Sequence, residues 1–186
     1  MAARGRMGWS ETVLDLWFRE IDPKAWFTKS DATDALIRER GLVIHEQLAR
    51  ELPPETREDA SAALAAVIVL DQFPRNIFRG TPHAFATDPI ALGLAKHAVA
   101  QGFDRSMSKN ERLFLYLPFE HCEDAAAQQQ CVSLFAQLDD PELTRYAEAH
   151  KVIIDRFGRF PHRNDILGRT STPEELEFLS QPGSSF

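Results

Sequence analysis

The segment PPETREDASAALAAVIVLDQF, residues 53–73, decides the fold class of this sequence. It opens with Pro53 and Pro54 and then carries acidic side chains, a combination that favours the first turns of a helix. From Ala60 to Leu70 a helix would place apolar side chains on nearly every side. A surface helix keeps one polar face, so this composition indicates a helix that is buried all round. The segment therefore predicts a helical protein with a buried helix.

Helical start and stop signals flank this segment on both sides, and no stretch shows the sustained two-residue alternation of a half-buried strand. The expected caps are Ser10, Ser30 or Asp31, Asp88, Ser108 with Glu111, Asp140 and Thr172 at helix starts, and Gly102 and Gly158 at helix ends. We expect an all-α fold of about eight helices joined by short loops. Short loops make successive helices antiparallel neighbours, which predicts a stack of helical hairpins.

The composition bounds the class of protein. The chain has 186 residues, 44% of them hydrophobic, and a formal net charge of −7. We expect one domain over 1–186, with frayed ends at 1–8 and 181–186. The negative charge argues against nucleic acid and against anionic membrane surfaces as partners. No segment reads as a secretory signal, and none approaches the length of a spanning helix.

The two cysteines point to a reducing compartment. Cys122 and Cys131 fall on one expected helix, where nine residues would separate them by about 13 Å along the axis and place them on opposite sides. They cannot pair within that helix. A reduced, cytoplasmic protein is the simplest interpretation.

Two similar phrases, VIVLDQFPRNIFRG at 67–80 and VIIDRFGRFPHRNDILGR at 152–169, follow apolar helical segments. We expect the proline of each phrase to end its helix and to begin an irregular loop, at roughly 71–87 and 158–171. Guanidinium groups that converge on a cleft can bind carboxylate or phosphate, whereas arginines paired with nearby acids would only hold the loops in place. The candidate ligand-binding residues are Arg75, Asn76, Arg79, Arg159, His162, Arg163, Asn164 and Arg169, and the candidate network carboxylates are Asp71, Asp124 and Asp155, with Asp165 as a further possible partner.

A third constellation is YLPFEHCED, residues 116–124. On a helix, Glu120 would share a face with Glu123 and Asp124. Glu120, His121 and Glu123 are therefore the candidate acid–base groups, with His150 or His162 brought in by folding. Neither an HExxH motif nor a repeated Glu-x-x-His pair occurs, so we expect no metal and no cofactor. The alternative is that these acids neutralise the arginines of the two phrases.

Several of these motifs together resemble a known family. LDQFPRNIFRGT, AFATDPIAL, ERLFLYLPFEHCED and RFGRFPHRNDILGR followed by STPEE are similar, in the same order, to the bacterial domain-of-unknown-function family number nine hundred and twenty-four. The similarity covers about residues 10 to 180. It implies an all-helical, tetratricopeptide-like superhelical stack and carries no established activity. That family usually has Ser where this chain has Cys122.

Three functions remain open at this stage. The first is a cytoplasmic binding module whose arginine-rich cleft holds an acidic peptide or a small molecule with a carboxylate or phosphate. The second is an enzyme that acts on a small anionic substrate, with Glu120, His121 or Glu123 transferring protons. The third is a purely structural network of arginines and carboxylates, with the function at an oligomer surface.

Overall fold

The computed structural model describes residues 8–185, and these residues form an all-helical fold with no strand. The expectation of an all-α protein with about eight helices is confirmed. The α-helices are α1 (Trp9–Asp15), α2 (Asp31–Arg50), α3 (Ala60–Ile77), α4 (Asp88–Gln101), α5 (Lys109–Glu120), α6 (Ala125–Ala136), α7 (Pro141–Phe157) and α8 (Pro173–Leu179). Within the described range, no helix is both long and apolar enough to cross a membrane.

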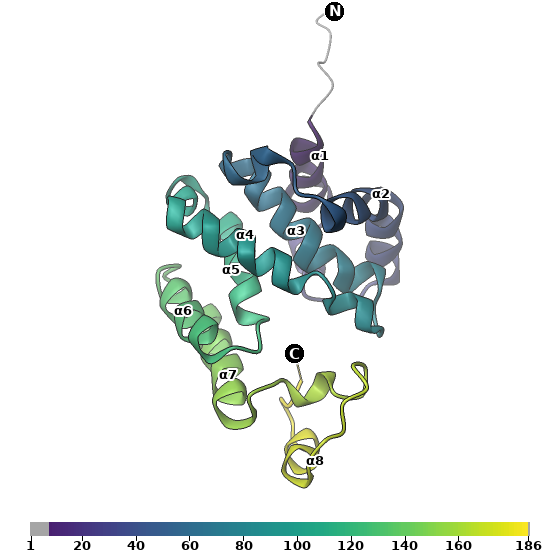
Figure 1. Cartoon of the computed structure of the whole chain (residues 1–186), viewed down its shortest axis with the longest axis vertical. Coiled ribbons are helices and arrows are strands. Elements are labelled where there is room, and N and C mark those ends of the chain that lie inside the picture. The colour runs from purple at the N-terminus through teal and green to yellow at the C-terminus, as the bar shows by residue number, and fades with distance from the viewer. Residues whose placement is uncertain (1–7, 186) are drawn as a thin grey trace, which may run out of the picture. The chain divides into compact units, whose positions relative to one another are not determined.

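The chain divides into two compact units (Figure 1). Unit 1 comprises Met1–Arg79 and His83–Pro118, and unit 2 comprises Gly80–Pro82 and Phe119–Phe186. The boundary falls inside α5. The expectation of one domain over 1–186 stays a prediction. So does the fraying of the ends, of which 1–7 and 186 lie outside the described residues. Within 181–185, Ser184 is buried and its hydroxyl donates to the Leu179 carbonyl.

Helix α3 is the centre of unit 1, where it contacts α1, α2 and α4 (Figure 1). Every side chain from Ala62 to Leu70 is at most 2% exposed, as the apolar run predicts. Burial of these side chains is the main favourable contribution to folding. The ring of Phe73, on α3, contacts that of Trp17, whose ring centroid lies 5.2 Å from that of Phe114, so the three rings form an aromatic cluster.

Gly41 lets α2 pass close to α3. A Cβ atom at Gly41 would lie 2.5 Å from the ring of Phe73, closer than atoms can approach without a shift. The glycine costs helix stability, on the order of 1 kcal/mol relative to alanine. The close approach explains its place in the middle of α2.

The expected helix end at Pro74 is wrong, because α3 continues through Pro74 to Ile77. Proline lacks an N–H, so it cannot satisfy the carbonyl four residues earlier, at Leu70. In unit 1 the hydroxyl of Thr87 donates to that carbonyl at 2.6 Å. A tertiary hydrogen bond thus replaces the missing helical one. At its other end α3 begins at Ala60, capped by Asp59, and the residues before it form a 3-10 helix, η3 (Pro54–Arg57), instead of an α-helical turn.

Most of the predicted caps are confirmed. The side chains of Ser30, Ser108, Asp140 and Thr172 accept backbone N–H groups of the first turns of their helices, and Gly102 and Gly158 end α4 and α7 in left-handed conformations. Two expected caps are wrong by a residue or two. Gly8 instead of Ser10 precedes α1, and Thr87 instead of Asp88 precedes α4.

Unit 2 is built on the pair α6 and α7, which lie side by side (Figure 1). Ile153, Ile154 and Phe160 form a buried cluster, against which Phe157 and Phe178 pack. A break at residues 121–124 separates α5 from α6, so the expectation of one helix through this stretch is wrong. Cys122 therefore lies in the break and Cys131 on α6, and both are reduced thiols.

Candidate functional site

The second Phe-Pro phrase forms an irregular connection in unit 2. Helix α7 ends at Gly158, whose φ of 69° favours glycine because a side chain is strained in the left-handed region. The chain then forms a short 3-10 helix, η6 (Pro161–Arg163), and reaches α8 through residues 164–172. Backbone outside regular helices needs side-chain partners for its polar groups. The arginines and the asparagine of the phrase provide several of them.

Glu123 and Arg169 form the first of two ion pairs that hold this connection. Arg169 donates from both terminal nitrogens to the Glu123 carboxylate, at 2.6 and 2.9 Å. The backbone N–H of Phe160 donates to the same carboxylate at 2.8 Å, and Arg169 also donates to the Phe160 carbonyl. Burial raises the pKa of Glu123, but the bonds from Arg169 and Phe160 outweigh burial and hold the pKa below its ordinary value.

Glu175 and Arg159 form the second ion pair. Arg159 donates to both oxygens of Glu175, at 2.6 and 2.8 Å, and the bonds from Arg159 lower the pKa of Glu175 to about 2. Glu175 also completes the capping box of α8 with Thr172. Asn164 joins the two pairs, because its amide nitrogen donates to Glu175 and its amide oxygen accepts from Arg169.

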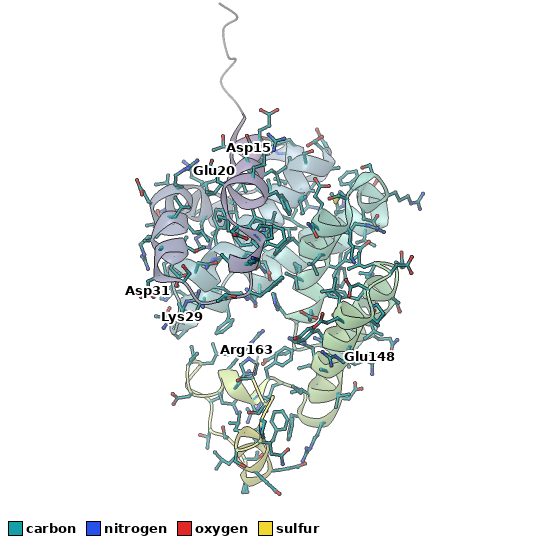
Figure 2. The ribbon with its side chains drawn as sticks, turned by 180° about the vertical axis from the view of Figure 1, so that it is seen from behind. Asp15, Glu20, Lys29, Asp31, Glu148 and Arg163 are labelled. Atoms are coloured by element: carbon teal, nitrogen blue, oxygen red, sulfur yellow. The ribbon has the colours of Figure 1, made fainter. Side chains whose placement is uncertain are left out.

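Aromatic and cationic groups gather around the buried ring of Phe160. The guanidinium of Arg163, labelled in Figure 2, lies 4.6 Å from the ring centroid and donates to the carbonyl of His121. The rings of His150 and His162 lie 5.6 and 5.7 Å from the same ring. Burial lowers the pKa of His150 to about 3 and that of His162 to about 4, and the positive charge of Arg163 acts in the same direction. Both histidines are therefore neutral near pH 7.

Folding brings an acidic group of residues 116–124, Glu120, next to a basic group of α7, His150. The Nδ1 atom of His150 lies 3.7 Å from the Glu120 carboxylate, and both side chains are less than a tenth exposed. Burial raises the pKa of the nearby thiol of Cys131, and the charge of Glu120 adds to that effect. The break at 121–124 prevents the continuous helical face on which Glu120, Glu123 and Asp124 were expected.

The first phrase lies in unit 1 and makes a different set of contacts. Arg75 donates to both oxygens of Asp88, at 2.8 and 2.9 Å, and lies 3.5 Å from the Asp71 carboxylate. Arg79 donates to both oxygens of Asp34, at 2.7 Å each, and the Asn76 amide donates to the same carboxylate. These contacts connect the end of α3 to the first turns of α2 and α4.

The carboxylates that pair with the arginines of the two phrases are only partly the ones that the sequence indicated. Glu123 pairs with an arginine, whereas Asp124 caps α6 and Asp155 pairs with Lys151. The partners that sequence reasoning missed are Asp34, Asp88 and Glu175. Each of them lies in the first turn of a helix, where the helix dipole already favours an acid, so their pattern gave no separate signal of an arginine partner.

A pocket that is open to solvent lies beside the second phrase in unit 2. It encloses about 590 Å³ and is lined by Pro161, His162, Asp165, Arg169, Thr170, Ser171, Leu176, Leu179, Ser184 and Ser185. Three residues that the sequence indicated line its wall: His162, Arg169 and Asp165. Its lining combines a guanidinium, a carboxylate, an imidazole and several hydroxyls with the apolar side chains of α8. Among residues 8–185, no group of three or more His, Cys, Asp or Glu side chains is arranged to hold a metal ion.

Comparisons with known proteins agree with the fold and assign no activity. The family described as bacterial proteins of unknown function, DUF924, matches residues 13–183. A solved structure of a protein of unknown function from Agrobacterium tumefaciens is 44% identical, covers 91% of this chain and 96% of its own, and superposes with a TM-score of 0.87. No curated protein matches the chain. With its match over nearly the full length, this chain belongs to the bacterial DUF924 family of unknown function.

Proposed function

We propose that the protein is a binding module whose unit 2 pocket holds a small molecule, or the end of a peptide, that carries a carboxylate on an apolar body. The observation that carries the proposal is the lining of the pocket. Arg169 supplies a fixed positive group, the hydroxyls of Thr170 and Ser171 supply donors, and Leu176 and Leu179 supply apolar surface. Ligand pockets commonly combine apolar walls with a few placed polar groups.

The surroundings of Arg169 support its role as an anchor. Its guanidinium is held by Glu123, Asn164 and the Phe160 carbonyl, so little rotamer freedom is lost when a ligand binds. A guanidinium has five N–H donors, and contacts among the described residues use four of them. The arginine can therefore hold its own carboxylate and still donate to a ligand.

The arginines of the first phrase have a structural role in this proposal. Arg75 and Arg79 each form a bidentate pair with an aspartate at a helix start, and neither lines the unit 2 pocket. They hold the helices of unit 1 together. The ligand site that the sequence suggested for both phrases is thus assigned to the second phrase alone.

Two finer features belong to the same proposal. Contacts of α2 with α3 and of α6 with α7 support a tetratricopeptide-like stack of hairpins. Two reduced cysteines are consistent with a cytoplasmic location.

The test uses 3-phenylpropionate as the anionic probe and phenethylamine as its cationic counterpart. Amide chemical shifts of unit 2 are followed by NMR during titration. We expect 3-phenylpropionate to shift the amides of His162, Ser171 and Leu176, and phenethylamine to leave them in place. Arg169→Lys should weaken binding about tenfold, because lysine cannot keep the planar donor set. Its matched control is Arg79→Lys, which changes the same kind of bidentate pair in unit 1 and should leave binding unchanged.

A second variant protects the test against a loss of folding. Leu176 is 58% exposed and lines the pocket, so Leu176→Glu adds a negative charge at the site with little cost to the core. It should abolish binding of 3-phenylpropionate while the spectrum stays that of a folded protein. Binding that survives both Arg169→Lys and Leu176→Glu would overturn the proposal.

The acid–base alternative rests on the pair of Glu120 and His150. Their proximity and burial are features of some catalytic sites. Neither residue lines the unit 2 pocket, so the binding module is the better supported function. If Glu120→Gln removed a turnover of a small anionic substrate while 3-phenylpropionate still bound, the alternative would take its place.

A further inference from the structure

A second open pocket lies in unit 1, and its lining is richer in acidic side chains than that of the unit 2 pocket. It encloses about 600 Å³ between the N-terminal helices and the start of α5. Its aromatic wall consists of Phe18 and Trp26. Three carboxylates, those of Glu11, Asp15 and Glu111, share the lining with one guanidinium, that of Arg19. The lining therefore carries a net charge of about −2 at neutral pH, from three acids and one base.

The aromatic wall is held in a fixed geometry. The indole N–H of Trp26 donates to the backbone carbonyl of Trp17 at 3.0 Å. The ring of Trp26 meets Phe114 edge to face at 4.9 Å, and the ring of Phe18 meets Trp26 edge to face at 5.8 Å. Phe18 and Arg19 come from a π-helical turn, η1 (Leu16–Glu20), a geometry that is frequent at functional sites.

The carboxylates of this pocket keep capacity to accept further hydrogen bonds. Glu11 accepts the N–H of Gly8 with one oxygen, and Glu111 accepts the N–H of Ser108 with one oxygen. Asp15, labelled in Figure 2, pairs with Arg19, whose side chain is 78% exposed. An exposed pair of this kind contributes little energy, and solvent screens it. A carboxylate has about four lone-pair sites, so one contact leaves room for a ligand ammonium group.

We propose that the unit 1 pocket binds a small organic amine, in which a protonated ammonium group is attached to an apolar or aromatic body. Trp26 and Phe18 pack against the body and attract the cation through their ring faces. Asp15, Glu11 and Glu111 accept hydrogen bonds from the ammonium group. The net acidic lining distinguishes this site from the unit 2 pocket, where Arg169 and Asp165 balance in charge, and the second site does not depend on the first.

The experiment titrates the protein with phenethylamine and follows the indole N–H resonance of Trp26 by NMR. Its neutral isostere 2-phenylethanol and its anionic counterpart 3-phenylpropionate serve as controls for charge. We expect phenethylamine to shift the Trp26 resonance saturably, with at least tenfold tighter binding than either control. The affinity should fall as the salt concentration rises, because the attraction is partly electrostatic.

Two variants and one control locate the site. Asp15→Asn removes one acid without a change in shape and should weaken phenethylamine binding about threefold to tenfold. Trp26→Leu should remove saturable binding, which is then followed by the amide resonances of Ser108 and Asn110. The control is Glu46→Gln, because Glu46 also pairs with an arginine four residues later but lies outside the pocket. It should leave the affinity unchanged.

Three results would overturn the proposal. One is equal binding of phenethylamine and 2-phenylethanol, which would mean that the charge plays no part. Another is full affinity in Asp15→Asn, in which the protein keeps its fold because Asp15 is partly exposed and asparagine has the same shape. The last is a response of the unit 2 amides alone, which would place the amine at the other pocket.

Discussion

The two Phe-Pro phrases have nearly the same residues and serve different structural purposes. In unit 1 the phrase stays helical through Pro74, and its arginines reach aspartates at the starts of two other helices. In unit 2 the helix ends ahead of Pro161, at Gly158, and Arg159 and Arg169 hold the connection between α7 and α8. The same short sequence therefore ties helices together in one unit and orders a loop in the other.

The difference follows from what lies next to each proline. Thr87 supplies a hydroxyl for the carbonyl that Pro74 leaves without its helical partner, so the first helix can continue. The second phrase has Gly158 ahead of its proline, and this glycine ends α7 in a left-handed conformation that glycine adopts without strain. The arginines then pair with whichever carboxylates the surrounding helices present. A local motif thus fixes the residue types of a network, and the tertiary fold fixes its partners.

The largest expected effect is a difference between the units in acid stability. The folded pKa values of His150 and His162, about 3 and about 4, lie below the ordinary value of 6.5. Between the folded and the ordinary pKa values, the unfolded chain binds more protons than the folded one. The contribution of these histidines to stability is therefore fully present above about pH 6.5 and is lost as the pH falls toward 3. His150 lies next to Glu120, His121, His162 and Arg163. Because its imidazole is protonated only in the unfolded chain, unit 2 should lose about 3 kcal/mol of stability between pH 6.5 and 4.5, at about 1.4 kcal/mol per pH unit.

Urea unfolding at several pH values checks this difference, because the units have separate probes. All three tryptophans lie in the sequence of unit 1, so their fluorescence follows that unit, and amide exchange in α6 and α7 follows unit 2. His150→Gln should flatten the pH dependence of unit 2, and the exposed His83→Gln should not change it. Transitions of the two probes that coincide at every pH would show one cooperative domain and would remove the contrast between units.

The next effect concerns Arg75, whose ion pair is more deeply buried than that of Arg79, the other arginine of the first phrase. Its neighbour Asp71 is fully buried, and its own side chain is 19% exposed. Arg75→Ala would leave that carboxylate without its guanidinium, at an expected cost of about 3 kcal/mol. Arg79→Ala breaks a pair whose arginine is 38% exposed and should cost about 1 kcal/mol or less. Chemical unfolding of both variants measures the contrast, and equal losses would mean that burial of the pair is not what matters.

The helices could be predicted from the sequence because their signals are local. The apolar run 60–70, the prolines at helix starts, and Gly102 and Gly158 at helix ends all act within one or two turns. Pro74 was misinterpreted because the group that rescues its helix lies thirteen residues further along the chain, at Thr87. The break at 121–124 has neither Gly nor Pro. Asp124 before three alanines is a start signal that could have indicated it.

The residue types of the site could be predicted from the sequence, but its arginine–carboxylate pairs could be predicted only in part. The arginines and Asn164 were found because they cluster in two phrases of an acidic chain. Their partners Asp34 and Asp88 lie in first turns of helices, where an acid is favoured without any arginine. Only packing of α2 and α4 against α3 brings these acids to Arg79 and Arg75. The two pockets were not predicted, because each depends on side chains from elements that are distant in sequence.

Gly41 offers a smaller test, of the packing that positions the first phrase. Gly41→Ala gains about 1 kcal/mol of helix propensity but places a methyl group 2.5 Å from the ring of Phe73. Overpacking of this kind costs about 1–3 kcal/mol, so after the gain in propensity we expect a net loss of up to about 2 kcal/mol in the free energy of unfolding. The exposed Gly93→Ala in α4 is the matched control, because its Cβ would meet no atom within 4 Å, and it should stabilise the protein. If both substitutions stabilised it, the close approach of α2 to α3 would not be limiting.

The last test concerns the coupling that keeps the first phrase helical. Thr87→Val keeps the shape of the side chain but removes the hydroxyl that donates to the buried Leu70 carbonyl, at an expected cost of about 1–2 kcal/mol. Pro74→Ala restores a backbone N–H at the position that a helix would use for that carbonyl. In the double variant the loss from Thr87→Val should therefore be smaller than in the protein with Pro74. A double-mutant cycle measured by chemical unfolding gives this coupling, and additive losses would show that the hydroxyl does not replace the helical bond.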